Sequence, residues 1–159
     1  MVINGFHIIK IEDLSGRKCN IYSIASSEKG DTLFEKFIDR YCDIYKEEID
    51  EIVNRLVVMG KAEGARIGYF KENEGKPADH VCALYDLPCR KLRVYCVRIG
   101  TSLVILGGGG PKKTGKWQED DNLSVSARQM ISFAAALFEA KDKGDICIDE
   151  NGIYELIEK

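Results

Sequence analysis

The chain opens with two short apolar runs separated by turn residues. Residues 7–12 (HIIKIE) and 19–25 (CNIYSIA) are rich in β-branched side chains, and DLSGR lies between them. Short β-prone runs that flank a turn predict two strands of a hairpin.

The apolar pattern then changes to the period of a helix. In each of two segments the apolar residues recur at three- and four-residue spacing, which predicts one buried helical face. These residues are Phe34, Phe37, Ile38 and Tyr41 in the first segment, and Ile49, Ile52, Val53, Leu56 and Val57 in the second. Asp31 or Thr32 is the expected N-cap of the first helix, and Gly60 is placed to end the second.

Three β-prone runs in the middle of the chain predict an antiparallel meander. They are residues 81–87 (VCALYDL), 92–100 (LRVYCVRIG) and 102–110 (SLVILGGGG), with turn signals at Pro88 and Gly100 between them. The segment 64–78 mixes Gly, Lys, Glu, Asn and Pro, which indicates a loop or a ragged strand with a turn.

A third helix is expected from a cap at Ser124 to a terminator at Gly144. Its inner face would consist of Ala127, Met130, Ile131, Ala134 and Leu137. Beyond it, Asn151-Gly152 favours a tight turn, and a short terminal helix from Gly152 is the alternative. The pattern as a whole predicts an α+β domain, with an antiparallel central sheet packed against an N-terminal helical hairpin and a further C-terminal helix.

Length and composition agree with one folded domain. The chain has 159 residues, of which 45% are hydrophobic and 31% charged, a balance typical of a packed core with a solvated surface. No apolar run approaches the length of a membrane span, and the N-terminus lacks the features of a signal peptide. Six cysteines without CxxC or Cys/His spacing predict reduced thiols in a cytoplasmic protein, with no metal and no cofactor.

Charge is distributed unevenly along the sequence. The segment 87–118 carries seven basic residues and no acid, whereas the rest of the chain has 16 basic and 26 acidic side chains. The seven are Arg90, Lys91, Arg93, Arg98, Lys112, Lys113 and Lys116. Such asymmetry predicts an anionic partner that meets one face of the protein, and an ordinary solvated surface is the alternative.

Strand alternation sorts the residues of LRVYCVR into two faces. Leu92, Val94 and Cys96 would face a core, which leaves Arg93 and Tyr95 together on the other side. A guanidinium and a phenol two residues apart could both meet an anionic ligand lying across the sheet. Packing of Tyr95 in a core is the alternative.

The sequence GGGGPKKTGKW follows the run that ends at Leu106. Backbone amides without side chains, beside several lysines, predict a phosphate-binding loop. Its expected contacts are Arg90, Gly109, Gly110, Lys112 and Lys116, with Trp117 stacked on a base or covering the edge of the core. Gly110 to Lys116 also matches GxxxxGK, but Trp117 stands where a nucleotide-hydrolysing P-loop needs Ser or Thr.

Residues 84–121, LYDLPCRKLRVYCVRIGTSLVILGGGGPKKTGKWQEDD, resemble the central sheet of the RelE/HigB-like bacterial toxins. In that family an arginine-bearing strand leads through a turn to a strand that ends in glycine and a basic pair. The resemblance covers about residues 19–127. It makes residues 1–159 a single RelE-like domain with 1–18 and 124–159 as extensions.

The resemblance implies a ribosome-dependent mRNA endoribonuclease that a partner antitoxin holds inactive. In this reading Arg93 and Lys113 are catalytic, Lys112 completes the basic pair, and Tyr95 transfers a proton or orients the phosphate. A non-catalytic module that binds protein or nucleic acid through the same basic face remains the other hypothesis. No sequence feature fixes the oligomeric state.

Overall fold

A computed structural model describes residues 1–71, 80–84, 90–112 and 121–156, and it shows an α+β fold built on one large sheet. The seven strands lie in the order β1-β2-β3-β7-β6-β5-β4, and all neighbouring pairs are antiparallel except β3 and β7. They are β1 (Val2–Ile3), β2 (Phe6–Lys10), β3 (Asn20–Ala25), β4 (Phe70–Lys71), β5 (Val81–Leu84), β6 (Leu92–Ile99) and β7 (Leu103–Pro111).

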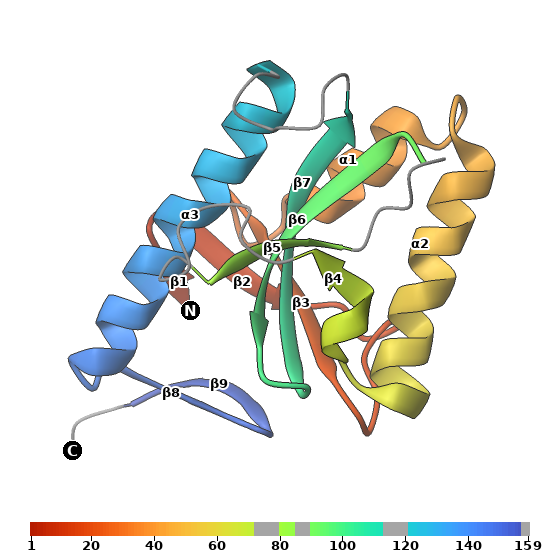
Figure 1. Ribbon diagram of the computed structural model, residues 1–159. Helices are drawn as coiled ribbons and strands as arrows, with labels where there is room; N and C mark the ends of the chain where they lie inside the picture. The colour runs from red at the N-terminus through yellow and green to blue at the C-terminus, as the bar shows by residue number, and fades with distance from the viewer. Residues whose placement is uncertain (72–79, 85–89, 113–120, 157–159) are drawn as a thin grey trace.

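Helices cover both faces of this sheet (Figure 1). Helices α1 (Leu33–Tyr41) and α2 (Lys46–Val58) lie on one face, and α3 (Asp121–Asp142) lies on the other. A separate hairpin of β8 (Ile146–Asp149) and β9 (Gly152–Glu155) follows α3. The sheet therefore separates two apolar cores, one under the helical hairpin and one under α3.

The predicted hairpin and meander are both confirmed. Strands β2 and β3 pair antiparallel, as do β5 with β6 and β6 with β7. The two-residue strand β1, which pairs with β2, was not predicted, because a strand this short leaves almost no pattern in the sequence.

Helix α1 begins where its sequence places it. Thr32 Oγ1 accepts a hydrogen bond from the Glu35 amide at 3.1 Å, and the Glu35 carboxylate accepts one from the Thr32 amide at 3.4 Å. This reciprocal capping box settles the choice between Asp31 and Thr32 in favour of Thr32. Phe34, Phe37 and Tyr41 are buried, as the spacing predicts.

The prediction that Gly60 ends the second helix is wrong. Helix α2 continues into a π-helical turn, Met59–Glu63, and the chain leaves it at Gly64, whose φ is +79°. Gly60 instead lies against the loop after β2, where a Cβ would stand 1.9 Å from the Leu14 carbonyl oxygen. Its own carbonyl accepts hydrogen bonds from the Lys18 and Cys19 amides, so glycine is needed here for close approach.

The last helix and hairpin differ from prediction at their boundaries. Helix α3 begins at Asp121, so Ser124 lies inside it and is not its cap. Gly144, with φ of +80°, follows its C-terminus as predicted. The turn between β8 and β9 lies at residues 150–151, one residue before the predicted Asn151-Gly152, and residues 152–155 form a strand and not the alternative helix.

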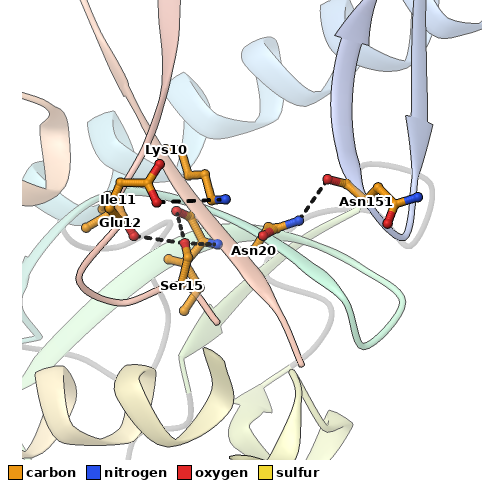
Figure 2. Close-up of polar contacts among 7 residues, drawn as sticks. Lys10, Ile11, Glu12, Ser15, Asn20 and Asn151 are labelled. Carbon is orange, nitrogen blue, oxygen red and sulfur yellow. Dashed lines mark hydrogen bonds and ion pairs between the residues drawn. The ribbon is translucent and has the colours of Figure 1, made fainter. Parts of the chain in front are cut away.

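Polar contacts fix the connection between β2 and β3 and join it to the C-terminal hairpin (Figure 2). Ser15 Oγ donates to the Ile11 carbonyl at 2.8 Å and accepts from the Ile21 amide at 2.9 Å. Asn20 Nδ2 donates to the Asn151 carbonyl at 3.0 Å. The first and last hairpins are thereby linked across the fold.

Replacing Gly60 with alanine is expected to destabilise the protein by about 1–3 kcal/mol, because the new methyl group overlaps the Leu14 carbonyl. Gly68→Ala is the matched control, since a Cβ there has no neighbour within 4 Å; its effect should stay within about 0.5 kcal/mol. Urea unfolding followed by circular dichroism measures both. Equal effects of the two substitutions would contradict the packing role of Gly60.

Candidate functional site

Arg93 and Tyr95 lie on strand β6, and Tyr95 faces the side of the sheet that α3 covers. Leu92, Val94 and Cys96 belong to the core under α1 and α2, whereas Tyr95 and Val97 belong to the core under α3. The predicted alternation of β6 is confirmed for these five side chains.

Both side chains are buried, with 2% of Arg93 and none of Tyr95 exposed. Tyr95 packs in the core under α3, which agrees with the alternative prediction that this tyrosine is a core residue. Burial of a charged guanidinium is unusual, because desolvation is costly unless polar groups compensate it. In this conformation the α3 side of β6 is therefore closed to a large ligand.

The prediction of a glycine-rich phosphate loop is corrected by strand β7, which extends through Pro111. Gly109 and Gly110 pair with Val94 and Arg93 of β6. The pairing shifts between Val94 and Cys96, so that Gly107 and Gly108 together lie opposite Tyr95 in a bulge. The glycine run is sheet backbone here, and its predicted phosphate contacts at Gly109 and Gly110 would have to be made from a strand.

Close packing explains why these positions carry no side chain. A Cβ on Gly107 would lie 2.4 Å from Met130 Sδ of α3, and one on Gly109 would lie 1.8 Å from the Arg93 carbonyl oxygen. On the opposite side of the sheet, a Cβ on Gly110 would lie 3.0 Å from Tyr41 Oη of α1. Glycine in a strand marks such approaches of neighbouring backbone or side chains.

The described basic residues are divided between different parts of the surface. Arg90 Nη2 pairs with Glu51 Oε1 of α2 at 2.5 Å, and the Lys91 amide donates to Glu48 Oε1 of the same helix at 2.6 Å. Arg98 Nε donates to the Ala65 carbonyl at 2.7 Å. Arg90 therefore lies against α2, whereas Arg98 contacts the segment that follows that helix, so these two cations have different neighbours.

Lys112 is the remaining described residue of the predicted contact set. It is half-buried, and its amide donates to the Lys91 carbonyl at 2.7 Å, which extends the pairing of β6 and β7 by one step. Lys113, Lys116 and Trp117 lie outside the described residues.

Two buried thiols have pKa values that argue against a nucleophilic role. Burial raises the pKa of Cys19 to about 12. A hydrogen bond with Cys82, together with burial, raises the pKa of Cys96 well above its ordinary value. Because the thiolate is the reactive form, neither residue is a poised nucleophile at neutral pH.

The pairing of Cys96 with Cys82 was not recognised from the sequence. The two residues stand directly opposite each other on β6 and β5. Only the strand register brings them together, and the predicted meander did not specify that register.

Within the part of the chain that the structure describes, no cluster of three or more His, Cys, Asp or Glu side chains could hold a metal ion. Over the same residues, no helix combines the length and apolar character needed to cross a membrane.

Comparison with protein-family models, with curated proteins and with solved structures gives no match to this chain. The structure itself defines the class of protein: an α+β domain with a mostly antiparallel seven-stranded sheet and three α-helices among its described residues.

Replacing Gly107 with alanine is expected to destabilise the fold by about 1–3 kcal/mol, because its methyl group overlaps Met130. The double variant with Met130→Ala should lose less unfolding free energy than the two single variants lose together. The difference, which is the coupling energy, should be about 0.5–3 kcal/mol. Chemical unfolding of the unaltered protein, the two single variants and the double variant measures this coupling energy.

The neighbouring Gly108→Ala is the control, since its Cβ would meet Ser126 Oγ at an ordinary 3.6 Å. Additive effects of Gly107→Ala and Met130→Ala would show that α3 does not depend on this contact.

Proposed function

We propose that the chain is a divergent RelE/HigB-like toxin, a cytoplasmic ribosome-dependent mRNA endoribonuclease that a partner antitoxin holds inactive. The observation that carries the proposal is the burial of an arginine, Arg93, on the same strand as Tyr95 and two residues from it. The order of strand β3, helices α1 and α2, and the meander β5-β6-β7 also agrees with the order of elements that the sequence resemblance implies.

The chemistry of RNA cleavage suits these residue types. Attack by a ribose 2′-hydroxyl requires a base, an acid and stabilisation of an anionic, crowded phosphorane. Arg93 and Lys113 would stabilise that charge, with Lys112 beside them, and Tyr95 would orient the phosphate or transfer a proton. Guanidinium groups bind phosphate through two parallel hydrogen bonds, which favours Arg93 for the central role.

Burial of Arg93 places a condition on this function. At 2% exposure the guanidinium cannot contact an RNA phosphate in the conformation described. A cleavage-competent state must therefore uncover Arg93, and we propose that it opens between α3 and β6. The contact between Gly107 and Met130 is one of those that would have to separate.

The same burial favours a second candidate function, a non-catalytic module that binds protein or nucleic acid. Arg93 and Tyr95 would then be structural, and binding would depend on exposed cations such as Lys91. Because attraction between lysines and phosphates weakens as salt is added, nucleic-acid binding by this module should be salt-dependent and should leave the RNA uncut.

In a reconstituted translation system, the purified protein is expected to create new mRNA 5′ ends only when ribosomes are present. The Arg93→Ala/Lys112→Ala/Lys113→Ala variant should create none, because it lacks the charges that stabilise the phosphorane. Sequencing of 5′ ends measures both. Undiminished cleavage by a folded triple variant would contradict the site, and absence of cleavage by the unaltered protein would favour the binding module.

Two further variants separate catalysis from folding and from overall charge. Lys112→Ala/Lys113→Ala keeps the buried Arg93 in place, so it tests the site without removing a core side chain. Lys18→Ala/Lys29→Ala/Lys61→Ala removes three positive charges, as many as the Arg93/Lys112/Lys113 variant, from exposed positions outside the basic segment, and this control should cleave normally. Circular dichroism establishes that each variant is folded.

A further inference from the structure

Cys82 and Cys96 form a pair of thiols inside the sheet. They occupy directly opposite positions on the antiparallel strands β5 and β6. Their Sγ atoms lie 3.7 Å apart, and the exposed fractions of the two residues are 5% and 0%. Each Sγ also lies near the carbonyl oxygen of the other residue, at 3.8 and 3.6 Å.

Strand pairing already provides the backbone separation that a disulfide needs. Directly opposite residues of an antiparallel pair have Cα atoms about 4.5–5.5 Å apart. Disulfides accept Cα separations of about 4.4–6.8 Å, with a sulfur–sulfur bond of about 2.0 Å. Rotation of the side chains can therefore bring the sulfur atoms into bonding distance while the strands keep their register.

We propose that Cys82 and Cys96 are a redox modification site at which a peroxide forms an intramolecular disulfide. One sulfur attacks a peroxide oxygen, which breaks the O–O bond and gives a sulfenic acid and water. The second sulfur attacks the first, and the sulfenic oxygen leaves as a second water with the remaining thiol proton. Two thiols lose two electrons, and one hydrogen peroxide accepts them.

The environment of the pair selects the class of oxidant. Both sulfurs lie in the apolar core under α1 and α2, so a small neutral peroxide can approach where a bulky charged disulfide cannot. The raised pKa of Cys96 keeps its thiol protonated, which slows its reaction with peroxide. The 3.7 Å separation places the second sulfur beside any sulfenic acid that forms, which favours closure of the disulfide. The disulfide, and not a lasting sulfenic acid, is then the product that accumulates.

The bond would join two strands that are now held together by backbone pairing and packing. It closes a short loop, since the two cysteines are 14 positions apart in the sequence. Cross-linking of such a loop restricts the unfolded chain. The oxidised protein should therefore unfold at a higher temperature than the reduced protein, and a thiol reductant should abolish the difference.

The test treats the reduced full-length chain with hydrogen peroxide, blocks the remaining thiols and maps tryptic peptides by mass spectrometry. Cys96 lies on the peptide VYCVR, and Cys82 shares its peptide, residues 72–90, with Cys89. We expect a cross-linked pair of these peptides, lighter than their sum by two hydrogen atoms. Oxidation of the half-buried Cys42 and Cys147 serves as the positive control that the peroxide reacted with accessible thiols.

Substitution identifies the partner within the longer peptide. In Cys89→Ser the cross-link should persist, and in Cys82→Ala it should disappear. Loss of the link in Cys89→Ser, or an unmodified Cys96 in the unaltered chain when Cys42 is oxidised, would overturn the proposal. Cross-linked dimers on a non-reducing gel would overturn the intramolecular pairing. The unaltered chain and Cys89→Ser decide the matter even if Cys82→Ala fails to fold.

Discussion

Close approach across strand β7 is the constraint on which the rest of the structure depends. This strand lies between two cores, with Val104 and Leu106 facing α1 and α2, and Leu103 and Ile105 facing α3. Beyond Leu106 its glycines let Met130 of α3 and the backbone of β6 come nearer than any side chain would permit. The resulting bulge opposite Tyr95 is part of the same arrangement. A larger residue at Gly107 would push α3 away from the sheet and would loosen the core that contains Tyr95.

This constraint also explains which features could be predicted from the sequence. Helix α1 has a strong period and a capping box, and the meander has three β-prone runs with turns between them, so local patterns were sufficient. The sequence pattern assigns Gly60 to a helix end, and it assigns the glycines of β7 both to a β-prone run and to a phosphate loop, because glycine serves turns and close packing equally well. Their real neighbours, Leu14 and Met130, are distant in the sequence. Only tertiary structure decides between these uses.

The candidate site shows the same limit in a different way. Alternation along β6 correctly separated Tyr95 from Leu92, but it could not indicate which helix covers each side. A run of basic residues in sequence is likewise no measure of a basic surface. Arg90 pairs with Glu51 of α2, while Arg93 is buried within the fold. Strand geometry sends neighbouring residues to opposite faces, so a dense basic segment is divided when it enters a sheet.

Burial of Arg93 links the fold to both functional hypotheses. A guanidinium in a low-dielectric interior is costly unless polar groups compensate it. Retaining the charge is understandable if α3 separates from the sheet and the guanidinium then meets phosphate, since a preorganised cation stabilises a developing anion most strongly where water is excluded. If Arg93 is purely structural, an apolar residue of similar volume should replace it without loss of binding. The chemical reason for an arginine at this position therefore distinguishes an enzyme that opens from a module that stays closed.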